Sequence, residues 1–321
     1  MQVLVANQRQ VLIVDAERGT VTIAGGLDDR PTCLAADALM PGRVWCGTRA
    51  AGVFRSDDGG ASWTLSGLPG RQIMSLAASA EVVWAGTEPT QLWRSDDGGA
   101  SWQHMEGLEA LPSSSEWAFP PRPETHHVRW ITPHPAEPER LWVAIEAGAL
   151  VHTPDGGRTW RDRVEGSPVD THELAIHPAA PDVLRSAAGD GYFESHDAGA
   201  TWSRPRAGLE VGYLRSIAIS PGRSDTVVVS AASGPRSTYT AGASDGRLYR
   251  RAGTAAWERV RHGWPDPPVT IAPLLIPGAE DIEILAADER GLHVSTDGGG
   301  RWELAAAWPS APDHLRALVA L

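Results

Sequence analysis

Short hydrophobic runs separated by turn-forming residues recur along the whole chain and predict β-strands. One unit contains four such runs, at residues 32–36, 43–47, 52–55 and 62–66. The following unit repeats the pattern between residues 73 and 105. No apolar residues recur at helical spacing over a length that would predict an extended helix. The pattern therefore indicates an all-β protein built from four-stranded units.

An octapeptide of the form S-x-D-x-G-x-[ST]-W marks the same place in successive units. Residues 56–63 read SDDGGASW, and the same eight residues return unchanged at 95–102. Looser copies span residues 153–160, 195–202 and 295–302, and a worn copy lies near residues 253–257. Ser and Asp side chains can hydrogen-bond nearby backbone N–H groups, and Gly supplies positive φ, so the octapeptide predicts a turn. Its Trp is expected to begin the next strand and to pack against the sheet.

The octapeptide resembles the Asp box, also called the BNR repeat, and the resemblance covers nearly the whole chain. It implies a β-propeller in which each box forms the turn between the third and fourth strands of a blade. Sialidases and photosystem II assembly factors share such repeats, and the chain looks most similar to stand-alone bacterial BNR/YVTN-like repeat proteins. We expect the repeated Asp residues to stabilise turns, because equivalent carboxylates spread around a ring cannot converge on one substrate.

Counting strands predicts seven blades, the first of which is closed by the C-terminal strand. Residues 2–27 contain three strand-like runs and lack a first strand, whereas residues 314–321 resemble a first strand with no second strand after it. Joining the two would bury the edges that an open sheet exposes. The predicted blades of this single domain, residues 1–321, are 1–27 with 313–321, 28–68, 69–108, 124–166, 170–209, 211–264 and 267–308.

Composition and charge narrow the classes of partner. The formal net charge of -12 disfavours nucleic acid, because such binders neutralise phosphates with basic residues, and it disfavours anionic membranes in the same way. No apolar stretch approaches the roughly 20 residues that span a bilayer. Residues 1–10 lack the pattern of a signal peptide, and Cys33 and Cys46 are expected to be reduced and buried. We therefore expect a cytoplasmic monomer.

Two long connections predict the face on which function lies. The insertion at residues 108–127 joins two blades, and that at 233–246 joins a second strand to a third, so both belong opposite the octapeptide turns. Long loops on a rigid scaffold commonly carry binding or catalysis. The candidate ligand-binding residues on this face are Trp117, Arg122, His126, His127, Tyr213, Arg236 and Tyr239.

Two classes of function remain open. The first is a binding propeller that recognises an unknown small molecule or a protein segment. The second is a glycosidase-like hydrolase or lyase, for which the candidate catalytic residues are Glu146, His172, Glu173 and Asp190. Sialidase activity is disfavoured, because the arginine motif near the start of sialidases is missing. Several of these His and Glu residues are suitable metal ligands, but no short spacing such as H-x-x-x-H accompanies them, so we expect no metal and no other cofactor.

Overall fold

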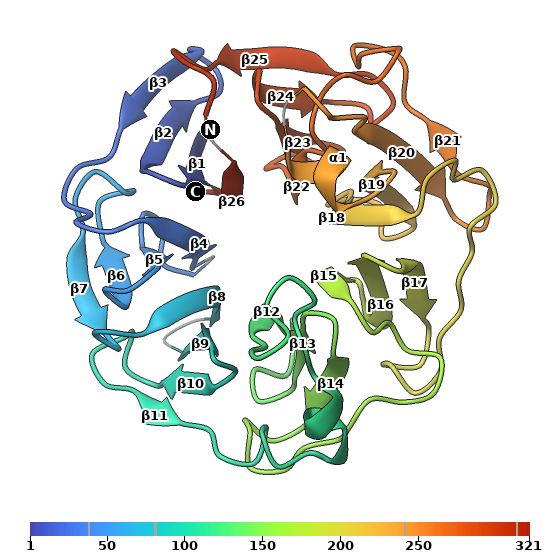
Figure 1. Ribbon diagram of the computed structural model, residues 1–321. Helices are drawn as coiled ribbons and strands as arrows, with labels where there is room; N and C mark the ends of the chain where they lie inside the picture. Colours follow the sequence, from blue (N-terminus) through green and yellow to red (C-terminus); the bar gives the residue numbers. More distant parts are fainter. Residues whose placement is uncertain (38, 80–81, 241, 313) are drawn as a thin grey trace.

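The chain closes into a ring of seven antiparallel sheets, shown in the computed structural model of Figure 1. The structure describes residues 1–37, 39–79, 82–240, 242–312 and 314–321. Each sheet is one blade of a β-propeller, and the first strand of each blade lies nearest the ring centre (Figure 1). The predicted all-β, seven-bladed architecture is confirmed.

The strands follow the ring in chain order, with blade one holding both ends. Blade one contains β26 (Leu315–Ala320), β1 (Gln2–Asn7), β2 (Val11–Asp15) and β3 (Thr20–Ile23). Blade two contains β4 (Pro31–Ala36), β5 (Val44–Thr48), β6 (Val53–Ser56) and β7 (Thr64–Gly67). Blade three contains β8 (Gln72–Ser79), β9 (Val82–Glu88), β10 (Leu92–Ser95) and β11 (Gln103–His104). Blades four and five contain β12 (Val128–Pro133), β13 (Leu141–Ile145) and β14 (Ala149–Thr153), and β15 (Thr171–His177), β16 (Ala180–Ala188) and β17 (Gly191–Ser195). Blades six and seven contain β18 (Tyr213–Ile219), β19 (Thr226–Ala232), β20 (Arg247–Ala252) and β21 (Glu258–Arg259), and β22 (Leu274–Pro277), β23 (Ile284–Ala287), β24 (Gly291–Ser295) and β25 (Glu303–Ala307).

Two short helical segments interrupt the strands. They are the 3-10 helix η1 (Pro112–Glu116) and the helix α1 (Pro235–Tyr239), and each lies in one of the two insertions. Within the described part of the chain, no helix has the length and apolar character to cross a bilayer.

The two ends of the chain complete blade one, as predicted. β26 pairs antiparallel with β1, so that Val3 lies opposite Ala320 and Leu4 opposite Val319. Val3 and Leu4 have no exposed surface. The pairing closes the ring and covers the edge of β1, whose N–H and C=O groups would otherwise lack partners. Residue 313, which the prediction assigned to this blade, lies outside the described residues.

Blade seven begins later than the sequence pattern suggested. The predicted blade begins at residue 267, whereas its first strand, β22, begins at Leu274. Pro273 has no N–H for a ladder hydrogen bond. The N–H of Ala272 donates instead to the carbonyl of Thr238 in the second insertion, at 3.2 Å. A proline and a contact from outside the blade therefore delay the start of the strand.

The octapeptides form the turns that follow the third strands. In blade three, the Ser95 hydroxyl donates to Asp97 Oδ1 at 2.8 Å and accepts the N–H of Gly99 at 2.7 Å. Asp97 also accepts the N–H and the hydroxyl of Ser101, at 2.8 and 2.6 Å. Gly99 has a φ of +91°, which an L side chain rarely adopts. The same bonds recur in blades two, four and five, so the repeated Asp residues stabilise turns.

We expect acid to weaken these turns. Hydrogen bonds from Ser or Thr lower the pKa of Asp58, Asp97 and Asp197 from 3.8 to about 2. A carboxyl group with a lower pKa in the folded state stabilises the fold above its unfolded pKa, and this stabilisation is lost as the pH falls from about 4 to about 2. We therefore expect the urea concentration at the unfolding midpoint to fall less between about pH 4 and about pH 2 in a variant with Asn at all three positions than in the wild type. An equal loss would contradict the prediction, and Asp28→Asn, at an exposed residue between β3 and β4, is the control.

The core lies between adjacent blades and uses Trp residues of the second strands. Trp45 and Trp84 are 0% exposed and Trp142 is 2% exposed. Each lies at the corresponding place in its blade, on β5, β9 and β13. Cys33 and Cys46 are free and buried, as predicted. Packing between the blades therefore holds the ring rigid around its centre.

Candidate functional site

Strand order places both insertions on one face of the ring. Because the first and third strands of a blade run toward the octapeptide turns, the loops between second and third strands and the connections between blades lie opposite them. We call this the loop face. η1 lies in the connection between blades three and four, and α1 lies between β19 and β20. The N–H of Thr90, in the loop between β9 and β10, donates to the carbonyl of His126 at 3.0 Å, which ties the first insertion to a neighbouring loop.

An extra residue interrupts the first strand in six of the blades. Near the loop face, the register of β4, β8, β12, β15, β18 and β26 with the second strand shifts by one residue. A β-bulge of this kind leaves one residue outside the ladder and re-aims its side chain. The residues left over are Thr32, Met74, Arg129, His172, Arg215 and Arg316.

Three of these residues are arginines, and they converge at the ring centre from blades four, six and one. Burial lowers the pKa of Arg215 to about 10, and the charges of Arg129 and Arg316 contribute to that decrease. The protein atoms around its guanidinium group and the charge of Arg129 also lower the pKa of Arg316, although this side chain still reaches solvent. Side chains of three separate blades affect one another in this way because they face a common axis.

The three guanidinium groups differ in their partners. Arg129 Nε lies 3.4 Å from Glu146 Oε2. Arg215 is 3% exposed and donates to two backbone carbonyls of other blades, those of Ala272 at 2.5 Å and Leu315 at 2.6 Å. Arg316 is exposed. Among the described residues, neither Arg215 nor Arg316 has a carboxylate within ion-pair distance, so no ion pair there balances their charges.

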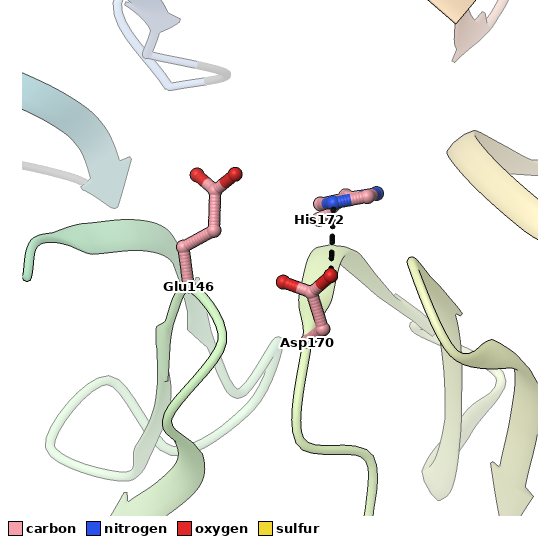
Figure 2. Close-up of side chains that lie close together, drawn as sticks. All are labelled: Glu146, Asp170 and His172. Atoms are coloured by element: carbon pink, nitrogen blue, oxygen red, sulfur yellow. Dashed lines mark ion pairs between the residues drawn. The ribbon is translucent and has the colours of Figure 1, made fainter. Parts of the chain in front are cut away.

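Two carboxylates and a histidine lie beside the arginines. Glu146, which follows β13, and Asp170, which precedes β15, bring their oxygens within 4.8 Å of each other and of a nitrogen of His172 (Figure 2). Asp170 Oδ2 lies 3.7 Å from His172 Nε2, and Asp170 Oδ1 accepts the N–H of Ala147 at 2.9 Å. Burial opposes ionisation of Glu146, but the hydrogen bond from His127 and the charge of Arg129 lower its pKa to about 2.

A backbone contact determines which nitrogen of His172 carries the proton. Nδ1 lies 2.5 Å from the carbonyl oxygen of Leu214, which can only accept, so Nδ1 carries a hydrogen. Burial lowers the pKa of His172 despite the opposing charge of Asp170, so the ring is neutral at pH 7. Nε2 therefore presents a lone pair toward Asp170 and Glu146, with the hydroxyl of Tyr213 at 3.3 Å. We call the assembled group the axial cluster: Arg129, Glu146, Asp170, His172, Arg215 and Arg316.

The pKa of a neighbouring carboxyl group, that of Glu173, is shifted in the opposite direction from the pKa of Glu146. Burial raises its pKa to about 7, although hydrogen bonds from Ser216 and Ile217 oppose the change. Its Oε2 accepts the hydroxyl of Ser216 at 2.6 Å and the N–H of Ile217 at 3.3 Å. Near neutral pH, Glu146 is thus ionised while Glu173 is divided between its two forms, which is the difference that an acid–base pair requires.

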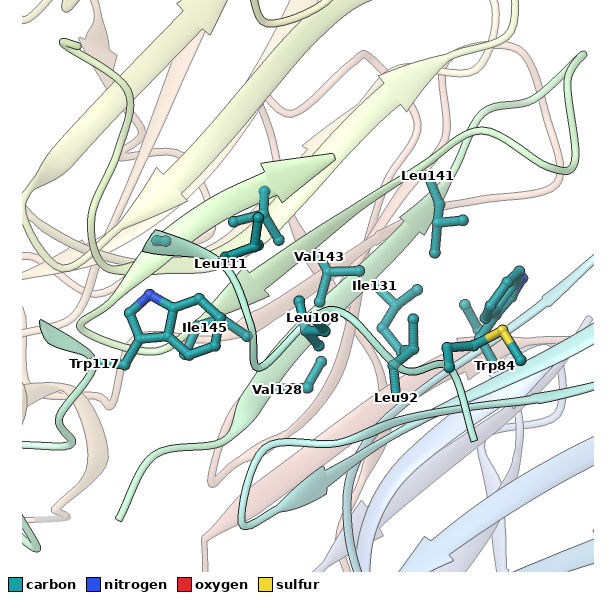
Figure 3. Packing of buried hydrophobic residues seen from close by; sticks show 14 residues of the cluster. Trp84, Leu92, Leu108, Leu111, Trp117, Val128, Ile131, Leu141, Val143 and Ile145 are labelled. Atoms are coloured by element: carbon teal, nitrogen blue, oxygen red, sulfur yellow. The ribbon is translucent and has the colours of Figure 1, made fainter. Parts of the chain in front are cut away.

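Trp117, a candidate for stacking on a ligand, lies in the hydrophobic core beneath the first insertion (Figure 3). Its side chain is 5% exposed and shares a buried cluster with Leu111 and Ile145. Its Nε1 donates to the Ser113 hydroxyl at 3.0 Å. Gly148 leaves room for the ring, because a Cβ there would lie 2.9 Å from Trp117 Cδ1. The indole therefore anchors the insertion and offers a ligand little surface.

The other candidates of the first insertion divide into two groups. Arg122 Nη2 lies 2.8 Å from Glu88 Oε2, and His126 Nδ1 lies 2.7 Å from Thr90 Oγ1, so both attach the insertion to blade three. His127 is buried, and its Nε2 donates to Glu146 Oε2 at 2.6 Å. Only the last of these three contacts reaches the axial cluster.

The second insertion brings an aromatic ring to the axis. The guanidinium carbon of Arg215 lies 5.0 Å from the ring centre of Tyr239, and the ring centres of Tyr239 and Tyr213 lie 6.5 Å apart. Arg236 is exposed on α1, and Asp190 is exposed in the loop between β16 and β17. The structure therefore places Tyr213 and Tyr239 beside the arginines, whereas Arg236 and Asp190 lie at exposed positions.

Four members of the axial cluster were not among the candidates that the sequence pattern suggested. The three arginines share a signal, because residues 127–129, 213–215 and 314–316 read HVR, YLR and HLR. Each tripeptide spans the start of a first strand and ends on its bulge residue. Asp170 carries no comparable signal, because its position depends on the connection between blades four and five.

Comparison with known proteins reveals likeness in fold. No protein-family model matches the chain, and no curated protein matches it in sequence. The GH74 xyloglucanase from Xanthomonas campestris superposes with a TM-score of 0.71 and 16% identity, over 95% of this chain and 52% of that chain. A structure of YCF48 bound to D1 peptide superposes with a TM-score of 0.61 and 18% identity, over 87% of this chain and 83% of that chain. YCF48 from Cyanidioschyzon merolae superposes with a TM-score of 0.61 and 14% identity, over 88% of this chain and 86% of that chain. The chain thus spans about half the length of the xyloglucanase. At these identities the likeness extends to the fold alone, and by fold the chain is a seven-bladed β-propeller.

Proposed function

We propose that this protein is a binding propeller that holds an anionic ligand, bearing a carboxylate or phosphate group, over the axial cluster on its loop face. The octapeptide turns, which we assign to the Asp-box family, occupy the opposite face and serve the fold. The observation that carries the proposal is the place of Arg129, Arg215 and Arg316 on the bulges of three first strands, near enough for their charges to affect one another. Among the described residues, the last two form no ion pair with a carboxylate.

Electrostatics and shape both favour an anion at this place. Like charges that converge raise the free energy of the site, and a bound anion offsets that cost. The planar guanidinium group matches carboxylate and phosphate oxygens with two parallel hydrogen bonds. Tyr213 and Tyr239 add aromatic surface beside the arginines. A protein segment with an acidic group is one candidate ligand, and the D1 peptide complex of YCF48, a neighbour of similar fold, supports it.

Titration with inorganic phosphate and with citrate, followed by thermal unfolding, tests the proposal. An anion that binds only the folded state raises the melting temperature. We expect such a rise in the wild-type protein and a smaller rise at high NaCl concentration, because salt screens charges. The rise should be lost in Arg316→Ala, whose side chain is exposed and can be removed without opening the core.

Arg18→Ala is the matched control. Arg18 lies in the turn between β2 and β3 on the opposite face, with 81% of its side chain exposed. This variant should respond to the anions as the wild type does. Equal responses of the two variants would mean that the anions act elsewhere, and that result, like an unresponsive wild type, would reject the proposal.

A hydrolase or lyase is the second candidate, and the two carboxyl groups favour it. Glu146 has a pKa of about 2 and Glu173 one of about 7, so one is available as a base and the other as an acid near neutral pH. An assay with aryl glycosides distinguishes the two functions. Turnover that disappears in Glu173→Gln would support an enzyme, and the absence of turnover in the wild type would argue for binding alone.

A further inference from the structure

We infer that Glu146, Asp170 and His172 form a binding site for a divalent transition-metal ion such as Zn²⁺ or Mn²⁺, with further coordination positions left for water or a ligand. The residue pattern alone led us to expect no metal, and Asp170 was not among the ligand types considered there. The inference rests on the geometry of these three side chains and does not depend on the anion-binding role of the arginines.

The spacing of the three groups suits a single ion. Two ligand atoms at about 2.1 Å from one tetrahedral ion lie about 3.4 Å apart. Asp170 Oδ2 and His172 Nε2 are 3.7 Å apart, and Glu146 offers an oxygen within 4.8 Å of both. Figure 2 shows Glu146 on one segment and Asp170 and His172 on the neighbouring one, with the contact between Asp170 and His172 dashed.

The histidine presents the nitrogen that a metal requires. His172 Nδ1 donates its hydrogen to the Leu214 carbonyl, so the lone pair of the ring lies on Nε2, toward Asp170 and Glu146.

Outer contacts hold all three ligands, as in established metal sites. His172 Nδ1 donates to the Leu214 carbonyl, and Glu146 accepts from His127. Asp170 Oδ1 accepts the N–H of Ala147, which leaves Oδ2 directed at the histidine. These contacts orient the ligands without occupying the lone pair of Nε2 or Asp170 Oδ2.

A cation would relieve an unfavourable arrangement of acceptors. The Nε2 lone pair faces a carboxylate oxygen, and both accept hydrogen bonds. The hydroxyl of Tyr213 lies 3.3 Å from Nε2, longer than an ordinary O–H hydrogen bond. The backbone also makes room, because a Cβ at Gly189 would overlap Asp170 Oδ2. One imidazole and two carboxylates suit zinc or manganese, whereas calcium and magnesium prefer oxygen ligands alone.

Calorimetric titration of Zn²⁺ into the chelator-treated full-length protein tests the site. We expect one tightly bound ion per chain and no comparable heat with Mg²⁺. Asp170→Asn keeps an oxygen for the N–H of Ala147 and removes the charge, and it should weaken binding by about tenfold or more. Gly189→Ala retains all three ligands but displaces Asp170, and it should weaken binding similarly.

Matched controls separate this site from other sources of affinity. Asp190→Asn alters an exposed carboxylate on the same face and should bind Zn²⁺ as the wild type does. Arg316→Ala should abolish the response to anions without weakening Zn²⁺ binding. The anion-binding proposal and the metal-site proposal can therefore be rejected independently of each other. The inference is overturned if the wild type binds no Zn²⁺, or if Asp170→Asn and Gly189→Ala, both shown to be folded by thermal unfolding, bind it as tightly as the wild type.

Discussion

Deleting residues 315–321 should abolish the folded monomer. These residues form β26, the innermost strand of blade one, and Leu315 and Leu318 are 2% and 7% exposed in a cluster that also contains Val3 and Val5. Removing a buried Leu side chain costs about 2–5 kcal/mol, against a total stability of about 5–15 kcal/mol for a typical domain. The deletion removes two of them, exposes the edge of β1 and takes away the Leu315 carbonyl that Arg215 contacts. Circular dichroism and size-exclusion chromatography measure the loss.

Single substitutions in the same strand provide the controls for this deletion. Leu318→Ala should lower the free energy of unfolding by about 2–5 kcal/mol while leaving a folded protein. Arg316→Ala, at an exposed position, should unfold near the wild-type temperature. A truncated chain that unfolds cooperatively at the wild-type temperature would show that the ring does not depend on this closure.

Trp117→Ala should destabilise the protein by about 3–5 kcal/mol, the usual cost of truncating a buried Trp. The ring is 5% exposed, and it joins the first insertion to the core of blade four. Its loss leaves a cavity next to Leu111 and Ile145 and removes the hydrogen bond to Ser113. Urea denaturation with both spectroscopic and calorimetric detection measures the change.

Phe119→Ala is the matched control for this position. Phe119 lies in the same insertion but is only half-buried, so its removal should cost less than that of Trp117. A Trp117→Ala protein with an unchanged urea midpoint would show that the indole contributes little to packing. The ring would then return to the candidates for stacking on a ligand.

The architecture was predictable because its signals are local. Each octapeptide carries the Ser, Asp and Gly that close its own turn, as Ser95, Asp97 and Gly99 show, so the turn forms from contacts within a few residues. The hydrophobic runs between the turns then predict strands in units of four. Closure by the C-terminal strand followed from counting strands, because the N-terminal unit lacked a first strand and the C-terminal end contained a first strand with no second strand after it.

The site was predictable only in part, because its members are brought together by pairing between strands. Glu146 and His172 could be suggested from their places in loops and strand starts, but their approach to Asp170 depends on how blades four and five sit side by side. The arginines depend on a one-residue shift of register, which strict alternation along a strand does not reveal. Trp117 stands among Ser and Pro residues in the chain, yet the fold buries it.

The amino-acid sequence by itself thus determined the repeat, the turns, the number of blades and the closure of the ring, since these follow from hydrogen bonds and hydrophobic spacing between near neighbours. The tertiary structure decided which side chains face the axis. Arg129, Arg215 and Arg316 are far apart in the chain and meet only because bulges on three blades aim them at one centre. Burial and the charges of neighbouring blades then shift the pKa values of Arg215, Arg316 and Glu146, and these influences come together only when the ring has closed.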